Sequence, residues 1–440
     1  MSATNDGSGL GQRGQLTTLR SCPGAWEQFE GVRQLSLAIC STLESDDYML
    51  QAMDDVSPAK WHLAHTTWFF ERFILTRCQW YEVFHPSYDF LFNSYYRTAG
   101  AFHSRPRRGL LSRPSTSEIT GYRAHVEAGM KRLLLEDQES FQMKDHALVD
   151  LLELGLNHEQ QHQELLLSDI KYNFFSQPLA PALRSPHLLH RSASNLPQPM
   201  NWIDIEPGIH LIGASGEAFS YDNERPEHTV FVDSVSMGSR LVSNQEYQAF
   251  IEDGGYEKVA LWLSEGWDWI VDGNVQHPLY WQKKDATWQE FTLHGWAELD
   301  PSIPVSHINY FEADAFARWS GARLPTEQEW EIFAGSHRDM DRGQGFDLNT
   351  LHAKPAGNDD LQLSSLWQWT SSCYGPYPGF KPLAGNLAEY NGKFMVNQYV
   401  LRGGSYATPP NHLRDSYRNF YPTNASWQFS GIRLAKTKEN

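Results

Sequence analysis

Two histidines four residues apart carry the clearest chemical signal in this chain of 440 residues. They are the first and last residues of the string His158-Glu-Gln-Gln-His162, which lies inside a strongly helical stretch that follows Leu148. On a helix, positions i and i+4 lie on one face, so two imidazoles can bind the same ion. Two imidazoles alone bind weakly, and the pair therefore predicts part of a metal site that needs a third ligand from elsewhere.

A second helical segment offers that ligand. Ser57 followed by Pro58 is typical of an N-cap with proline at the first helical position, and the helix is expected to run to about Thr76. It carries His62 and His65 one turn apart, and spacing does not choose between them. Metal sites in helical bundles are built from side chains on facing helices, so either histidine can complete the pair.

Spacing leaves the metal and the reaction open. Imidazole suits zinc, copper, iron and nickel alike. The same five residues fit the His-Glu-x-x-His pattern of zinc proteases, although that pattern gives no role to the second half of the chain. Two structural readings also compete: an exposed histidine pair without a ligand, and core histidines packed beside Trp61 or Trp68.

The elements that must position these histidines form an antiparallel four-helix bundle in our interpretation. Apolar residues recur at helical spacing in four segments, 31–43, 58–76, 119–136 and 144–172. Between the second and third segments lies a long stretch, 80–117, rich in aromatic residues and then in arginine. A loop of that length inside a compact domain is usually functional.

After the helical segments the composition and the apolar pattern of the sequence change. Residues 177–199 contain five prolines and many serines and histidines, which is typical of a linker. Residues 200–440 hold short apolar runs, glycine turns and most of the tryptophans, and indicate an irregular α+β domain. Strands are expected at 209–213, 229–232 and 399–403, and helices only at 244–253, 311–320 and 327–334. The predicted division is a disordered lead at 1–24, a bundle at 25–176, a linker at 177–199 and a second domain at 200–440.

Composition narrows the class of partner. The chain has 36 basic and 53 acidic residues, a net charge of −17, which disfavours nucleic acid and anionic membranes. No run of about 18 apolar residues predicts a membrane span, and the first residues lack the apolar core of a signal peptide. Four cysteines without a CxxC pair favour a reducing cytoplasm. The oligomeric state is not predicted.

The motifs together resemble a known family. His65 in Trp61-His-Leu-Ala-His65, with His158-Glu-Gln-Gln-His162, resembles the DinB-like helical domain of the ergothioneine-biosynthetic sulfoxide synthases. The second half resembles the formylglycine-generating-enzyme domain, a variant of the C-type lectin fold. Five motifs carry that likeness: Pro304-Val-Ser-His-Ile-Asn309, Ala322-Arg-Leu-Pro-Thr-Glu-Gln-Glu-Trp330, Trp367-Gln-Trp-Thr370, Leu401-Arg-Gly-Gly-Ser405 and Phe429-Ser-Gly-Ile-Arg433.

The resemblance implies a reaction. Family members use O2 to join a thiol sulfur to the imidazole C2 of hercynine, which is Nα-trimethylhistidine, and oxidise that sulfur to a sulfoxide. Their Fe(II) is held by three histidines, which map onto His65, His158 and His162. The family's Leu-Ala-His string favours His65 over His62. Three neutral ligands without a carboxylate would separate this site from the usual two-histidine-one-carboxylate oxygenases.

The resemblance also implies substrate contacts. Asn419 and Phe420 stand where the family places an Asn-aromatic pair near the trimethylammonium and carboxylate of hercynine, although tryptophan is common at the second position. Gln161 is expected to hydrogen-bond the substrate imidazole. The thiol, cysteine or γ-glutamylcysteine, carries carboxylates that arginines can bind. The candidates are Arg414, Arg418 and the run Arg105-Pro-Arg-Arg108. Tyr421, where some glutamyl-using members have an acidic residue, favours free cysteine.

Proton delivery is assigned to tyrosine. Tyr95 and Tyr96, on the long aromatic loop, are the predicted pair, with plain packing as the alternative. Some family members use a tyrosine of the second domain instead, for which Tyr374 and Tyr377 are the candidates.

Three other functions remain open on the sequence. A formylglycine-generating oxidase would need paired cysteines near the C-terminus, whereas residues 413–421 contain none and Cys373 stands alone. A zinc-dependent DinB-like thiol transferase would use the same histidines. A non-catalytic binding protein would leave the three histidines without an explanation.

Overall fold

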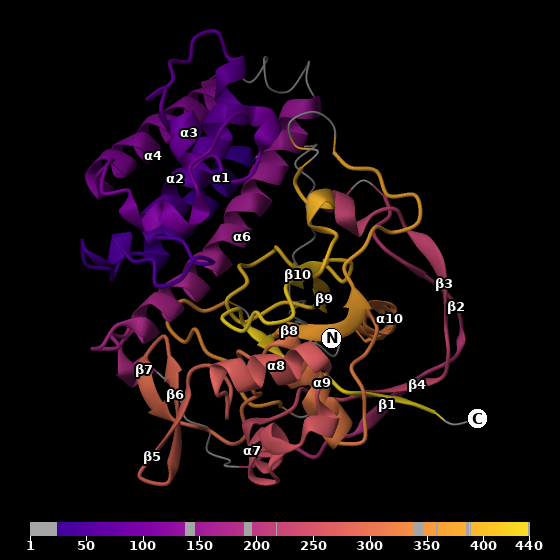
Figure 1. The fold of residues 1–440 in the computed structure, drawn as a ribbon. Helices are drawn as coiled ribbons and strands as arrows, with labels where there is room; N and C mark the ends of the chain where they lie inside the picture. Colours follow the sequence, from indigo (N-terminus) through magenta and orange to yellow (C-terminus); the bar gives the residue numbers. More distant parts are fainter. Residues whose placement is uncertain are drawn as a thin grey trace, which may run out of the picture.

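The computed structural model describes residues 24–136, 146–188, 196–216, 218–337, 346–357, 360–383, 387 and 389–438. The first 23 residues, which include Cys22 and nearly all of the expected disordered lead, lie outside this set. The helical first half and the sheet-rich second half lie side by side, with α6 running between them (Figure 1). None of the helices in the described ranges is long and apolar enough to cross a membrane.

The helices of the first half match the four predicted segments in place. They are α1 (Ala25–Ile39), α2 (Ala59–Phe73), α4 (Thr116–Lys131) and α6 (His146–Ser176), with a short α3 (Tyr88–Phe92) in the long loop. Helix α2 contacts α4 and α6, and α1 contacts α6. A capping box between Ser115 and Glu118 starts α4. The predicted cap of α2 is wrong by one residue, because Pro58 is the N-cap and the Ser57 amide donates to Asp169 instead.

The second half consists of four small sheets with helices packed around them. The sheets have the strand orders β1-β4-β12, β10-β9-β8-β11, β2-β3 and β5-β6-β7. Their strands are β1 (Trp202–Ile205), β2 (Gly208–Ile212), β3 (His228–Val232), β4 (Val235–Gly238), β5 (Trp281–Lys284), β6 (Thr287–Thr292), β7 (Gly295–Glu298), β8 (Trp367–Cys373), β9 (Tyr399–Arg402), β10 (Asn419–Tyr421), β11 (Ser430–Gly431) and β12 (Ala435–Thr437). Only β11 and β8 pair in parallel among these registers.

The helices of the second half include one that the sequence analysis missed. Helices α7 (Asn244–Glu252), α9 (Tyr310–Trp319) and α10 (Glu327–Ser336) lie within two residues of the predictions, and each begins with a capping box. The missed helix is α8 (Ser264–Gly273). Gly266 weakens the helical signal there, but a Cβ at Gly266 would lie 2.9 Å from the Phe311 side chain. Glycine is thus required by close packing against α9.

Helix α6 belongs to the packing of both halves. Its Glu164 carboxylate accepts hydrogen bonds from the Trp367 indole (2.7 Å), the Ser405 hydroxyl (2.5 Å) and the Thr408 hydroxyl (2.7 Å). The larger hydrophobic core is one continuous cluster that contains residues of both halves. The helix that carries the histidine pair is therefore fixed from both sides, which is what a precisely placed site needs.

Candidate metal centre

The three predicted histidines meet where α2 packs on α6. His65, His158 and His162 each offer a ring nitrogen, and these nitrogens all lie within 4.8 Å of one another. Nε2 of His65 is 3.2 Å from Nε2 of His158. Two ligand nitrogens on one metal ion, each about 2.1 Å from it, stand about 3 Å apart. The spacing of the cluster thus fits a single ion.

The surroundings of His65 show which of its nitrogens is free. Its Nδ1 lies 2.5 Å from the carbonyl oxygen of Phe92, which can only accept a hydrogen bond. Nδ1 therefore carries the proton, and Nε2 presents a lone pair to the other histidines. The ring is stacked on Trp61, with centroids 4.6 Å apart and planes at 12°, which fixes its orientation. His65 is placed as a metal ligand would be.

His62 lies outside this trio. Its Nδ1 is 2.9 Å from Nδ1 of His162, and its Nε2 is 2.9 Å from a carboxylate oxygen of Asp169. Both ring nitrogens of His62 are thus within hydrogen-bond distance of groups other than His65 and His158. The geometry favours His65, rather than His62, as the third histidine of the centre.

The electrostatics of the cluster keep its imidazoles neutral. Burial lowers the pKa of His158 to about 3. Burial, and then the nearness of His158, lowers the pKa of His65 and of His162 well below the usual value. Neutral imidazoles with converging lone pairs are the form that binds a metal ion, so the donor set fits one.

Glu159 does not take part in the centre. Its carboxylate accepts from Arg33 (2.9 Å) and Ser36 (2.6 Å) of α1, with Arg123 of α4 at 3.4 Å. A zinc protease needs this glutamate beside the metal as its general base. The His-Glu-x-x-His string therefore has no glutamate placed to act as the general base of a zinc protease.

Gln161 faces the second half of the chain between two tyrosines. Its side-chain amide donates to the Tyr417 hydroxyl and accepts from the Tyr390 hydroxyl, each at 2.7 Å. The Tyr390 ring lies 6.0 Å from that of His158 and is stacked on Tyr221 at 5.4 Å. Tyr390, Tyr221 and Tyr417 are all buried. No motif marked these three tyrosines in the sequence, since only the fold brings them to α6.

The predicted catalytic tyrosines differ in their approach to the histidines. Tyr96 is fully buried, 5.9 Å from Trp68 and 6.5 Å from Tyr390 between ring centroids. Trp68 in turn is stacked on His65. Tyr95 is stacked on the far side of Tyr96 at 4.6 Å, and burial raises its pKa to about 12. Both phenols hold their protons at neutral pH, as a proton donor must.

The alternative tyrosines of the second half are engaged elsewhere. The Tyr374 hydroxyl accepts from Asn223 at 2.9 Å, and the Tyr377 hydroxyl donates to Glu327 at 3.3 Å. Tyr374 is also stacked on Phe420, with centroids 4.0 Å apart. Phe420 reaches Phe394 at 5.8 Å, and Phe394 meets Tyr95 edge-on at 5.1 Å. Asn419 beside it accepts from the Phe420 amide at 2.9 Å. An aromatic series thus connects Phe420 with the tyrosine pair.

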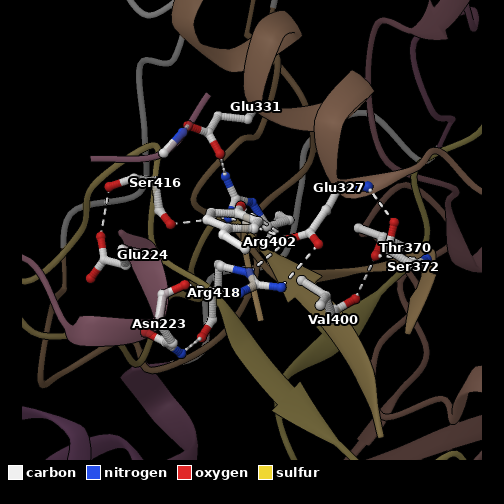
Figure 2. A network of polar contacts seen from close by, with 12 residues as sticks. Asn223, Glu224, Glu327, Glu331, Thr370, Ser372, Val400, Arg402, Ser416 and Arg418 are labelled. Atoms are coloured by element: carbon white, nitrogen blue, oxygen red, sulfur yellow. Dashed lines mark hydrogen bonds and ion pairs between the residues drawn. The ribbon is translucent and has the colours of Figure 1, made fainter. Parts of the chain in front are cut away.

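Two of the predicted substrate arginines belong to a buried ionic network, of which Figure 2 shows Arg418 with Glu327. Arg418 forms two hydrogen bonds to Glu327, at 2.8 and 3.0 Å, and donates also to the carbonyls of Asn223 and Gly375. Arg414 binds Glu224 at 2.7 Å. The charges of both arginines are already compensated by carboxylates. We therefore do not propose either arginine as a contact of a substrate carboxylate.

Arg108 has the opposite environment. It is 3% exposed, and its guanidinium lies 3.3 Å from the Trp61 ring centroid. It donates to the hydroxyls of Ser57 (2.9 Å) and Ser94 (3.1 Å), while its Nε has no partner. Within the described ranges no carboxylate forms an ion pair with it. Trp61 is also stacked on His65, so this guanidinium, which forms no ion pair among the described residues, stands one ring away from the histidines.

Comparison with known proteins covers both halves of the chain. The family model of the Sulfatase-modifying factor enzyme 1-like domain matches residues 190–438. Hercynine oxygenase of Mycobacterium tuberculosis is 31% identical over 76% of this chain and 81% of its own length. The Mycolicibacterium smegmatis protein of the same name is 33% identical over the same shares. Ergothioneine biosynthesis protein 1 of Schizosaccharomyces pombe is 29% identical over 50% of this chain and 28% of its own. The chain therefore belongs to the hercynine oxygenase family, and it is an oxygenase.

Proposed function

We propose that this protein is an Fe(II)- and O2-dependent sulfoxide synthase of ergothioneine biosynthesis. It joins the sulfur of cysteine or γ-glutamylcysteine to the imidazole C2 of hercynine and oxygenates that sulfur. The observation that carries the proposal is the convergence of three neutral imidazoles from α2 and α6 in a chain of the hercynine oxygenase family.

In this proposal His65, His158 and His162 hold the iron. Bound Fe(II) would supply the redox chemistry that couples O2 to a thiolate. The rest of the chain binds, orients and shields the substrates. Tyr390, Tyr221 and Gln161 close the side of the histidines that faces the second half, and all three are buried or half-buried. Such enclosure excludes water from the reacting groups.

Hercynine is proposed to lie between α6 and β10. Gln161, whose amide offers both a donor and an acceptor, would hydrogen-bond the substrate imidazole in place of Tyr390 or Tyr417. The permanent cation of hercynine suits aromatic faces. Phe420, backed by Tyr374, offers one such face, and Asn419 beside it offers polar contacts to the carboxylate.

The thiol substrate is proposed to place a carboxylate on Arg108. A buried guanidinium without a carboxylate partner gains most from a charged ligand, because its desolvation is already complete. Free cysteine is the favoured thiol. Burial raises the pKa of Tyr421, so this side chain stays neutral and offers no charge to the amino group of a glutamyl moiety.

Tyr96 is proposed as the proton donor, with Tyr95 behind it. Tyr96 is the member of the pair that touches Trp68 and Tyr390, and therefore stands nearer the histidines. Tyr390 is its competitor, because its hydroxyl already donates to Gln161.

Anaerobic reconstitution tests the function. The isolated protein is loaded with Fe(II), mixed with hercynine and with cysteine or γ-glutamylcysteine in turn, and exposed to O2, with products identified by mass spectrometry. A sulfoxide that requires both Fe(II) and O2 is expected. Thioether or thiol transfer that proceeds with Zn(II) and without O2 would instead identify a zinc-dependent transferase. Oxidation of a peptide cysteine with copper would identify a formylglycine-generating oxidase.

A further inference from the structure

His62 and Asp169 form a buried pair directly behind one histidine of the proposed centre. We infer that they are positioning residues, which hold His162 in the tautomer and orientation needed to bind the metal. This inference rests on the proposed metal site. It gives a reason for a fourth histidine, His62, beside the three proposed ligands.

The contacts form an unbroken series across two helices. Asp169 is 3% exposed and His62 is 4% exposed. One carboxylate oxygen of Asp169 lies 2.9 Å from Nε2 of His62 and 2.8 Å from the Ser57 amide nitrogen. Nδ1 of His62 lies 2.9 Å from Nδ1 of His162. Every member of the series is therefore within hydrogen-bond distance of the next.

The chemistry of the groups orders the protons. An ionised carboxylate can only accept, so Nε2 of His62 carries a proton and donates it to Asp169. With its proton on Nε2, the His62 ring offers Nδ1 as an acceptor, and Nδ1 of His162 is then the donor. That leaves the lone pair of His162 on Nε2, the nitrogen available to His65 and His158 in the cluster.

Sequence spacing places these groups on shared helix faces. His62 lies three residues before His65 on α2, and Asp169 lies seven residues, or two turns, after His162 on α6. The same two faces that build the proposed centre thus also build its support. Ser57, at the start of α2, anchors the carboxylate through its backbone amide.

The other two histidines have weaker support. Nδ1 of His65 is held by a neutral carbonyl oxygen, that of Phe92. Nδ1 of His158 is buried and has no partner. Only His162 is linked to an anion. Hydrogen bonding to a carboxylate raises the basicity of a histidine ligand, and loss of such a partner typically lowers metal affinity by about 10–100-fold.

Metal affinity, measured on the whole chain, tests the inference. Fe(II) dissociation constants are determined anaerobically by competition with a chelator, and Co(II) absorption spectra report ligand geometry. In His62→Phe the affinity should fall about 10–100-fold with an altered Co(II) spectrum. His62→Gln should restore most of the affinity, because its amide can accept from His162 and donate to Asp169. His85→Phe, at an exposed histidine, is the matched control and should match the wild type.

Asp169→Asn separates charge from orientation. The amide oxygen can still accept from His62 and from the Ser57 amide, so the tautomers persist while the negative charge is lost. We expect an affinity between those of the wild type and His62→Phe. If His62→Phe does not fold, the Fe(II) affinities of the wild type, His62→Gln and Asp169→Asn still test the inference. They should decrease in that order, and equal affinities in all three would overturn the inference.

Two further results would overturn it. Unchanged affinity and spectrum in a folded His62→Phe would show that His162 needs no such support. Complete loss of binding, equal to that of His65→Ala, would make His62 a ligand rather than a positioning residue. A wild-type chain that binds no Fe(II) would instead refute the proposed metal site itself, and this inference with it.

Discussion

Two buried polar clusters of this molecule differ in what completes them. In the second half, the guanidinium groups of Arg402, Arg414 and Arg418 each have a carboxylate, that of Glu331, Glu224 and Glu327 respectively. Figure 2 shows the first and the last of these pairs. At the junction of α2 and α6, three neutral imidazoles converge and the nearby Arg108 has no carboxylate in the described part of the chain. The first cluster is complete within the protein, and the second, in our proposal, is completed by a metal ion and a substrate.

The difference bears on the assignment of arginines, which residue type alone does not decide. An arginine beside an aromatic ring can be a substrate contact or a structural cation, and only its partners distinguish the two. Arg418 and Arg108 are equally buried, but one is neutralised and the other is not. The predictions below test whether this distinction separates stability from activity.

Removal of His158 should have the largest effect. In His158→Ala the centre loses one of three nitrogens, so stoichiometric Fe(II) binding and sulfoxide formation are expected to disappear. His65→Ala should do the same. Metal content of the purified variants, measured after Fe(II) loading and desalting, decides the matter. Wild-type iron content in His158→Ala would refute the site, and full turnover in His65→Ala would mean that the third histidine was chosen wrongly.

Loss of the proton donor should have the next largest effect. In Tyr96→Phe the ring packing against Trp68 persists while the hydroxyl is removed, so sulfoxide formation should slow about 10²–10⁴-fold or divert to thiol dioxygenation. Product ratios measured by mass spectrometry report this. Tyr95→Phe and Tyr390→Phe identify the donor if Tyr96→Phe is normal. Tyr48→Phe, whose hydroxyl donates to the Cys40 carbonyl, is the control, and unchanged ratios in all of the first three would clear them of this role.

Breaking the ionic network should cost stability and leave the metal in place. Glu327→Gln leaves the buried Arg418 uncompensated, and breaking such a pair typically destabilises a protein by about 3–5 kcal/mol. The free energy of unfolding in urea measures this. Asp204→Asn is the control, because its partner Lys438 is exposed and such pairs contribute about 1 kcal/mol or less. Altered Fe(II) affinity in folded Glu327→Gln would contradict the separation of the two clusters.

Replacement of Arg108 should have a smaller effect, confined to substrate. Hydrogen bonds to charged groups contribute about 1.5–3 kcal/mol, which corresponds to roughly 10–100-fold in KM. Arg108→Gln is therefore expected to raise KM for cysteine by that factor and to change KM for hercynine much less. Steady-state kinetics with each substrate varied in turn separates the two. An unchanged KM for the thiol would return Arg108 to a structural role.

The sequence predicted what depends on local spacing. The i, i+4 pair His158 and His162 needs only a helix to point to one place, and the capping boxes that start α7, α9 and α10 are local too. The boundaries of α7, α9 and α10 lie within two residues of the predictions, whereas α1 begins six residues before its predicted segment. Helix α8 was missed because the reason for Gly266 lies in another helix, α9.

Partners far apart in the chain could not be predicted in this way. Tyr390 reaches Gln161 across 229 positions, and Arg418 reaches Glu327 across 91. Which arginine is neutralised, and which tyrosine faces the histidines, depends on how the second half packs on α6. Spacing offers two histidines one turn apart, and the Leu-Ala-His string favours His65. The supporting role of His62 could not be predicted, because it depends on the position of Asp169 on the facing helix.

A buried amine between the two halves provides the smallest and most specific test. Lys171 of α6 lies 2.8 Å from Nε2 of His307 and 4.6 Å from the centroid of the Tyr280 ring. No ion pair to a carboxylate is formed by Lys171 among the residues that the structure describes. Burial lowers its pKa from 10.5 to about 7. It resembles Arg108 in lacking an anion, but it can respond by losing its proton.

This pKa fixes the sign of a pH dependence. Between pH 7.5 and 9 the unfolded chain holds a proton on Lys171 that the folded chain has lost, so stability rises with pH by about 1.4 kcal/mol per unit. His307, whose pKa is lowered by burial, contributes such a slope only below its usual value of 6.5. Glu312, whose pKa burial raises to about 7, titrates mainly below pH 7.5, so it adds little to the slope of stability within this window. In Lys171→Met the slope from Lys171 disappears, and the stability difference from wild type should change by about 2 kcal/mol across the window. Urea unfolding of both proteins at pH 7.5 and 9 measures this difference, and parallel curves would show that Lys171 stays charged in the folded protein.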